Sequence, residues 1–180
     1  MEDPEIRPTQ SAVVYENPWM KVREDKIVRR SGAAGIYGVV EKDDFAVIAA
    51  LQDGRLHLVE QYRYPVGGRY WEFPQGSSKT YRDDPLATAK AELREETGMV
   101  AKSIVHVGRL FEAYGYASQA LDAYFATDLH LVGAEPEAEE EGLVTRTFTV
   151  AEVERMIVDG VIRDAATVAT FGLLRLKGLL

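Results

Sequence analysis

Three glutamates stand close together near the middle of the chain, at Glu92, Glu95 and Glu96. In a helix, where successive residues are about 100° apart, the three side chains share an arc of about 100° beside an apolar stripe. Like charges three or four residues apart cost roughly a few tenths of a kcal/mol each. No lysine or arginine lies three or four residues from Glu92 or Glu96 to offset this cost. The stripe consists of Leu86, Ala89 and Leu93.

Two explanations of the acidic cluster stay open at this point. The first is a solvated helix face, which needs no ligand. The second is a hard divalent cation, because Mg²⁺ is commonly held by carboxylates together with the phosphates of a substrate. Such an ion would convert the repulsion among the glutamates into a binding site.

The residues around the cluster resemble a known motif. Ala91–Met99 is similar to the second half of the Nudix box, G-x5-E-x7-R-E-U-x-E-E-x-G-U, where U is aliphatic. When the motif is aligned on Gly98, all the glutamates that bind metal in that family are retained. The box arginine falls on Ala91, the first box glutamate falls on Asp83, and Gly76 lies one residue before the expected glycine. These departures touch scaffold positions, since the box arginine normally braces a glutamate.

The resemblance extends beyond the box. The segments Leu58–Pro65 and Trp71–Gly76 are similar to the sequence that leads into the box in ADP-ribose pyrophosphatases and related nucleoside-diphosphate-sugar hydrolases. Ile162–Thr167 resembles the terminal helix of those enzymes. Together the similar segments cover most of the chain, from about Val13 to Leu176.

The resemblance implies an α+β protein with the Nudix fold, in which a mixed β-sheet is sandwiched between helices and preceded by an N-terminal antiparallel β-meander. It implies a single Nudix hydrolase domain over residues 1–180, with the box at 76–99. The strands within about residues 1–45 are used for dimerisation in this subfamily, so a homodimer is expected.

The resemblance also implies a reaction and a metal. The expected reaction is hydrolysis of the pyrophosphate bond of a nucleoside diphosphate linked to a sugar, which gives a nucleoside monophosphate and a sugar phosphate. Mg²⁺, or Mn²⁺, is expected at Glu92, Glu95 and Glu96, together with the backbone carbonyl of Gln75. Two alternatives remain: a Nudix hydrolase of nucleoside triphosphates or dinucleoside polyphosphates, and a catalytically silent nucleotide-sensing domain.

Arg63 and Glu72 are candidate substrate-binding residues. Arg63 stands between an apolar strand and a proline, and a guanidinium at a strand end can bind a phosphate through two hydrogen bonds. The alternative is a surface arginine that pairs with Glu60 or Glu72. Glu72 lies between Trp71 and Phe73, which makes a purely solvated role less expected.

Three further residues are candidates for contact with the base or the sugar: Trp19, Tyr114 and Gln119. Where ADP-ribose hydrolases commonly have Ser-Pro-Gly followed by a glutamate, this chain has Ala113–Gln119, with Tyr114 and Gln119 in place of the proline and the acid. The change weakens the inference to ADP-ribose itself. The aromatic side chains can stack on a base, and they are equally suited to a core or a dimer interface.

The catalytic base is expected in the acidic run that ends at Glu141. Members of the subfamily often take a glutamate from a loop far downstream of the box, and the register against the following strand favours Glu141, followed by Glu139 and Glu140. An acidic run is also typical of a solvated loop. If no loop glutamate serves, Glu95 is the remaining candidate.

The local sequence independently predicts the elements that position these residues. Asp84-Pro85 and Gly98 predict a helix over residues 85–97. Thr149 and Glu152 form a capping box that opens a helix ending near Gly160, and Asp164 caps a last helix. The remaining pattern favours strands from Ala12 to about Tyr64, with a hairpin turn at Glu41–Asp44, and three later strands at Ser103–Leu110, Leu121–Ala126 and Val144–Phe148, with an acidic loop at Glu135–Glu141.

Composition restricts the partners. The chain has 180 residues, 21 Lys plus Arg and 29 Asp plus Glu, so its formal net charge is −8. This charge disfavours nucleic acid and anionic membranes as partners. The chain contains no cysteine, its N-terminus is acidic, and its longest apolar run is Phe45–Leu51. These features predict a cytoplasmic protein without a membrane span, acting on a small molecule.

Overall fold

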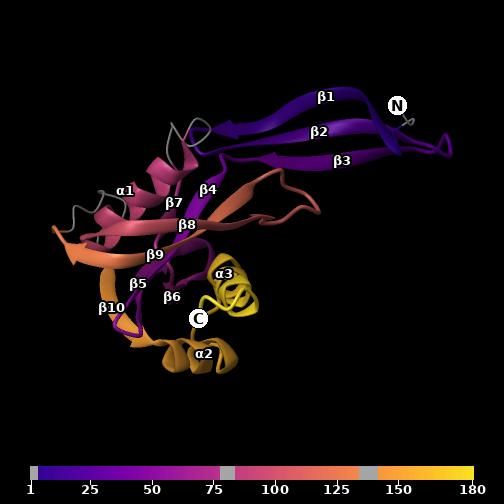
Figure 1. Cartoon of the computed structure of the whole chain (residues 1–180). Helices are drawn as coiled ribbons and strands as arrows, with labels where there is room; N and C mark the ends of the chain where they lie inside the picture. Colours follow the sequence, from indigo (N-terminus) through magenta and orange to yellow (C-terminus); the bar gives the residue numbers. More distant parts are fainter. Residues whose placement is uncertain (1–3, 78–83, 134–141) are drawn as a thin grey trace. The chain divides into compact units, whose positions relative to one another are not determined.

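The computed structural model describes residues 4–77, 84–133 and 142–180 (Figure 1). The chain divides into two compact units. The smaller unit comprises Met1–Asp43 and Phe111–Ala120, and the larger unit comprises Asp44–Leu110 and Leu121–Leu180.

The smaller unit is built on an antiparallel sheet in the order β1-β2-β3. Its strands are β1 (Ile6–Asn17), β2 (Met20–Arg29) and β3 (Ala34–Glu41). This sheet is the predicted N-terminal antiparallel meander. The segment 111–120 joins the free edge of β3, because Val40 forms a parallel bridge with Ala117 and the Tyr37 hydroxyl donates a hydrogen bond of 3.0 Å to the Gly115 carbonyl.

The larger unit contains a mixed sheet in the order β10-β5-β4-β9-β8, with β6 added to β5 and β7 added to β4. Strand β4 is antiparallel to β5 and β7 and parallel to β9. The strands are β4 (Phe45–Gln52), β5 (Arg55–Arg63), β6 (Gly68–Glu72), β7 (Gln75–Gly76), β8 (Met99–Phe111), β9 (Ala120–Leu131) and β10 (Val144–Thr149).

The hairpin turn predicted at Glu41–Asp44 is wrong. Strands β3 and β4 belong to different sheets, and the chain crosses from one sheet to the other at these residues. Both edges of β4 are already occupied, by β9 on one side and by β5 and β7 on the other. A polar segment between two apolar runs therefore marks a crossover here instead of a turn.

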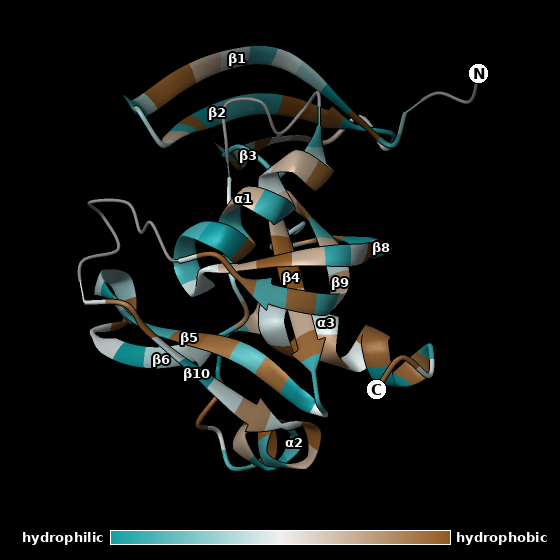
Figure 2. Cartoon of the chain, turned by 60° about the vertical axis from the view of Figure 1, so that its left-hand side comes forward, coloured by the Kyte–Doolittle hydropathy of each residue, from teal (hydrophilic) through white to brown (hydrophobic). Residues whose placement is uncertain are grey.

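Helix α1 (Pro85–Thr97) covers one face of the larger sheet, and α2 (Val150–Val158) and α3 (Ala165–Leu176) cover the other. The alternation along β4 defines the two faces, since successive strand residues point to opposite sides. Ala46, Ile48 and Ala50 pack with Ala89 and Leu93 of α1. On the other face, Val47 and Ala49 pack in the cluster that includes Phe171 and Leu174. Figure 2 shows β4 as a largely hydrophobic strand between these layers.

The helix boundaries follow the predicted caps. Asp84 accepts a hydrogen bond of 2.9 Å from the Ala87 amide, and α1 ends at Gly98, whose φ of 71° is left-handed. The capping box of Thr149 and Glu152 opens α2, and Asp164 caps α3. Strand β8 begins earlier than predicted, at Met99, directly after the Gly98 that ends α1. In the described part of the chain, no helix is long and apolar enough to cross a membrane.

Candidate active site

The helix glutamates are placed at the edge of the core. Glu92 and Glu96 are only 9% and 2% exposed, and Glu95 is half-buried. Packing of Ala89 and Leu93 against β4 turns the adjacent arc of α1 toward the sheet, so the two carboxylates are drawn inward with it. The solvated-face explanation of the cluster therefore fails for Glu92 and Glu96.

Strand β7 faces these carboxylates. The Gln75 amide donates a hydrogen bond of 3.1 Å to Oε2 of Glu96. Gly76 lies against Glu92 so closely that a Cβ atom on residue 76 would overlap the Glu92 carboxylate. Since β7 pairs with β4 through Ala46 and Val47, the sheet fixes the backbone that both carboxylates approach.

The donors at this place suit a hard cation. Two buried carboxylates approach one backbone segment, and the missing side chain of Gly76 leaves the space that one of them occupies. Carboxylate and backbone oxygens are the kinds of ligand that Mg²⁺ prefers. Over residues 4–77, 84–133 and 142–180, no three acidic or histidine side chains already form a metal-binding group, so joint ligation by the three glutamates requires side-chain rotation.

The contact between Gly76 and Glu92 gives a sharp prediction. A Cβ on residue 76 must displace the Glu92 carboxylate, and this displacement costs little stability because the end of a glutamate side chain can rotate away. We expect Gly76→Ala to keep the melting temperature within about 3 °C of the parent, equivalent to about 1 kcal/mol, while hydrolysis falls about a hundredfold. Parallel thermal melts and rate measurements test this, and a fully active Gly76→Ala variant would contradict it.

Arg63 and Gln61 surround the buried carboxylate of Glu72 on the paired strands β5 and β6. The Glu72 carboxylate is 2% exposed and accepts hydrogen bonds from Nε2 of Gln61 at 2.9 Å and from Nε of Arg63 at 3.2 Å. Nη2 of Arg63 also pairs with Glu72. Burial raises the pKa of Glu72, and the charge of Arg63 opposes the shift. Of the two partners considered for Arg63, the structure selects Glu72, whereas Glu60 pairs with Arg69.

The chain that follows the acidic run is attached near these groups. Nη2 of Arg69 donates a hydrogen bond of 2.8 Å to the Gly142 carbonyl, and the Thr145 hydroxyl donates one of 2.7 Å to the Glu96 carbonyl. The candidates for the base, Glu139, Glu140 and Glu141, lie outside the described residues, as does Asp83.

The remaining substrate candidates belong to the smaller unit. Trp19 and Tyr114 are 69% and 82% exposed, so neither is a core residue of this chain. The Gln119 side-chain amide donates a hydrogen bond of 2.6 Å to the Asp43 carbonyl. The structure thus gathers Arg63, Glu72, Gln75 and the helix glutamates in the larger unit and places Trp19, Tyr114 and Gln119 in the other.

Sequence reasoning missed several polar residues near β7. The Ser77 hydroxyl donates a hydrogen bond of 2.6 Å to the Asp44 carbonyl, and Arg109 pairs with both Asp44 and Asp122. One signal was available for Asp122, because it is the only charge in the apolar run Leu121–Ala126. A charge in the middle of a buried strand needs a partner.

Comparison with known proteins identifies the family. Residues 41–171 match the model of the NUDIX domain, and residues 6–40 match the model of the nucleoside diphosphate sugar hydrolase N-terminal domain. The chain therefore belongs to the Nudix family and is a Nudix pyrophosphohydrolase, as the resemblance implied.

Individual proteins agree with this assignment. The chain is 30% identical over 172 residues to an ADP-ribose pyrophosphatase of Mycobacterium tuberculosis, a match that covers 94% of this chain and 83% of that protein. It is 26% identical over 163 residues to an ADP-ribose pyrophosphatase of Bacillus subtilis, covering 90% and 82% of the two chains. The crystal structure of an ADP compounds hydrolase has the same fold, with a TM-score of 0.82, 20% sequence identity and coverage of 99% and 98%.

Proposed function

We propose that this chain hydrolyses the pyrophosphate bond of a nucleoside diphosphate linked to a sugar, giving a nucleoside monophosphate and a sugar phosphate. The observation that carries the chemistry is the pair of buried carboxylates, Glu92 and Glu96, against β7. The choice of substrate class is supported by the match of residues 6–40 to a nucleoside diphosphate sugar hydrolase domain and by the ADP-ribose pyrophosphatases among the relatives.

The proposal includes Mg²⁺, with Mn²⁺ as a substitute, bound by Glu92, Glu95, Glu96 and Gln75. When bound, the ion supplies neutralisation of phosphate charge and a lower pKa for the attacking water. The chain's own part is to orient the ligands: the Gln75 amide fixes one oxygen of Glu96, and the absence of a side chain at Gly76 leaves room for the Glu92 carboxylate.

Arg63 is proposed to bind a phosphate group of the substrate. Its side chain is 40% exposed while Glu72 is 2% exposed, so the buried carboxylate holds one side of the guanidinium and leaves part of it accessible. Glu72 thereby orients Arg63 instead of meeting the substrate itself. Trp19, Tyr114 and Gln119 remain proposed contacts for the base or sugar.

Arg63→Lys tests this role. Lysine keeps the positive charge but loses the planar set of donors that serves Glu72 and a phosphate together. We expect KM to rise about tenfold, corresponding to loss of one charge-assisted hydrogen bond, with a smaller change in kcat. Arg55→Lys, at the other end of β5, is the matched control and should leave both constants unchanged. Unaltered kinetics in Arg63→Lys would reduce Arg63 to a structural partner of Glu72.

Metal binding is testable without substrate. A cation that binds only the folded protein stabilises it by mass action, by about 2.7 kcal/mol at one hundred times its Kd. For a chain of this size we expect Mg²⁺ at that excess to raise the melting temperature by about 5–10 °C. The variant with both Glu92→Gln and Glu96→Gln should lose the rise. A rise of equal size in that variant would place the ion elsewhere.

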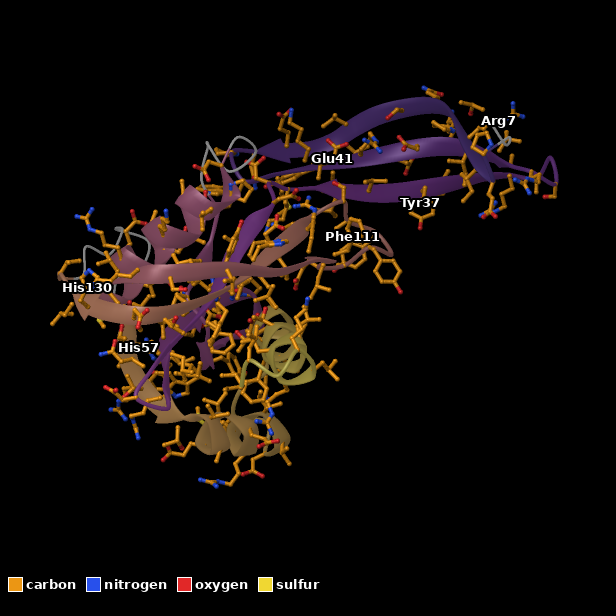
Figure 3. The ribbon with its side chains drawn as sticks, viewed as in Figure 1. Arg7, Tyr37, Glu41, His57, Phe111 and His130 are labelled. Atoms are coloured by element: carbon orange, nitrogen blue, oxygen red, sulfur yellow. The ribbon has the colours of Figure 1, made fainter. Side chains whose placement is uncertain are left out.

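The smaller unit supports a homodimer. Nearly every residue of β1 is exposed in the single chain, and large apolar side chains are left uncovered on this sheet. Figure 3 shows Tyr37 and Phe111 among the side chains of this unit, and they are 39% and 64% exposed. A small sheet needs a covered apolar face for stability, and a second copy of the sheet would supply it. Sedimentation equilibrium should give twice the chain mass.

The whole proposal treats residues 1–180 as one functional Nudix hydrolase domain in the cytoplasm. Its direct test is incubation with Mg²⁺ and a panel of ADP-ribose, GDP-mannose, UDP-glucose and NADH, followed by mass analysis of the products. Nucleoside triphosphates and a dinucleoside polyphosphate complete the panel. Cleavage of only the nucleoside triphosphates or the dinucleoside polyphosphate would shift the activity to the alternative substrate class. Cleavage of no compound in the panel would favour a nucleotide sensor.

A further inference from the structure

Arg109 links two acidic residues that lie far apart in the sequence. Its Nη1 is 2.6 Å from Oδ2 of Asp122 on β9, and its Nη2 pairs with the carboxylate of Asp44. The Asp122 side chain is 9% exposed, and its other oxygen lies 2.7 Å from Nε2 of His106 on β8. Arg109 lies on β8 and is fixed by Asp122 on the neighbouring strand β9. Arg109 in turn pairs with Asp44.

Asp44 is a residue that needs such an anchor. It ends the short connection Lys42–Asp44, which has no regular secondary structure and leads from β3 into β4. Repeating backbone hydrogen bonds of a sheet therefore do not fix its position. Because the ion pair with Arg109 restrains the Asp44 side chain, it also restrains the Asp44 carbonyl, the group that accepts the hydrogen bond from Ser77.

Ser77 directly follows the two residues of β7 that approach the helix glutamates. The register extends this relation across the sheet, since Asp122 pairs with Ala46 and Ala46 pairs with Gly76. Asp122 and Gly76 thus belong to one row of three neighbouring strands. A continuous series of contacts runs from Asp122 through Arg109 and Asp44 to Ser77, and from there along β7 to Glu92 and Glu96.

We propose that Arg109 is a positioning residue for the metal site, acting through Asp44 and Ser77 to hold Gln75 and Gly76 at the carboxylates of Glu96 and Glu92. This inference rests on the metal binding proposed above, and it assigns to Arg109 no contact with the substrate. Groups that only orient metal ligands commonly change metal affinity by about 10- to 100-fold. The pair of Arg109 with Asp44 is partly exposed on both sides and contributes little to stability, and the buried Asp122 keeps His106 as a partner when Arg109 is replaced. A positioning role therefore predicts a large effect on Mg²⁺ binding and a small one on the metal-free melting temperature.

The test is a double-mutant cycle with Arg109→Gln and Ser77→Ala, measured as Mg²⁺ affinity by titration calorimetry without substrate. Arg109→Gln removes the anchor of Asp44, and Ser77→Ala removes the link from Asp44 to β7. We expect each single variant to weaken Mg²⁺ binding about tenfold and the double variant to bind no more weakly than either, because both interrupt one series of contacts. Arg55→Gln is the matched control, since its side chain is 44% exposed against 47% for Arg109 and it pairs with Glu152 away from β7.

The outcomes separate this inference from the proposed substrate. Unchanged Mg²⁺ affinity in Arg109→Gln, or effects of the two changes that simply add, would overturn the positioning role. A loss of metal-free unfolding free energy as large as the loss of Mg²⁺ binding free energy would assign Arg109 to general stability. Normal Mg²⁺ binding by the parent without cleavage of any nucleotide sugar would reject the substrate class alone, while absence of Mg²⁺ binding by the parent would overturn both proposals.

Discussion

Glu96→Gln should nearly abolish hydrolysis and leave the fold intact. The change keeps the shape of the side chain and an oxygen that can accept the hydrogen bond from the Gln75 amide, but it removes the negative charge. Since even residues that only orient a metal ligand contribute about 10- to 100-fold, loss of a charged ligand should lower kcat by about a thousandfold. Glu92→Gln is expected to act in the same direction.

Glu96→Gln should lower activity but should not lower the stability of the fold. Glu92 and Glu96 are four residues apart on α1, so neutralising one of them removes a repulsion of roughly a few tenths of a kcal/mol. We therefore expect a metal-free melting temperature equal to or slightly above that of the parent. Glu154→Gln, an exposed change on α2, controls for the altered net charge. Unfolding of Glu96→Gln without metal, together with lost activity, would make Glu96 a structural residue.

The sequence was sufficient for elements whose signals are local. Helix α1 spans Pro85–Thr97 as predicted, because Asp84 and Gly98 satisfy or end the backbone hydrogen bonds within one turn of each terminus. The same holds for the capping box at Thr149. The position of the glutamates beside an apolar stripe also followed from helix periodicity, and the burial of Glu92 and Glu96 agrees with it.

Features that depend on distant segments were beyond local patterns. The crossover at Glu41–Asp44 looks like a turn because polar residues separate two apolar runs in either case, and only occupation of both edges of β4 distinguishes them. Likewise, the choice of Glu72 over Glu60 as the partner of Arg63 depends on the register of β5 against β6. Pairing register between strands is a tertiary property.

The contacts at β7 illustrate the same limit within the candidate site. The resemblance implied that the Gln75 carbonyl binds metal, but the approach of Gly76 to Glu92 and the hydrogen bond from Ser77 to the Asp44 carbonyl depend on how distant segments of the chain pack together. Ser77 stands at the box position normally held by glycine. Gly76, one residue earlier, supplies the space that the Glu92 carboxylate occupies. The glycine of the motif is shifted by one residue in this chain, and it still has a steric role, because a side chain there would displace the Glu92 carboxylate.

Replacement of the glutamate that serves as the catalytic base should also have a very large effect on kcat. Gly142, directly after the acidic run, is bound by Arg69, and Thr145 is bound to the Glu96 carbonyl, so the chain leaving the run is attached to the unit that carries the helix glutamates. This attachment supports a base in the run, and Glu141 is the first candidate. Because the attachment lies at Gly142 and Thr145, it stays the same when single glutamates within the run are replaced.

If Glu141 activates the water, Glu141→Gln should lose several orders of magnitude in kcat, on the order of 10²–10⁴, with KM little changed. Glu139→Gln and Glu140→Gln serve as controls for charge, and each should retain most of the activity, because general-base catalysis needs one carboxylate within about 3 Å of the water. The measurement is kcat for each variant separately at saturating Mg²⁺ and substrate. A large loss in Glu139→Gln or Glu140→Gln alone would move the base to that residue. If all three variants stay within about tenfold of the parent, the run holds no base, and Glu95 on α1 becomes the residue to test by the same substitution.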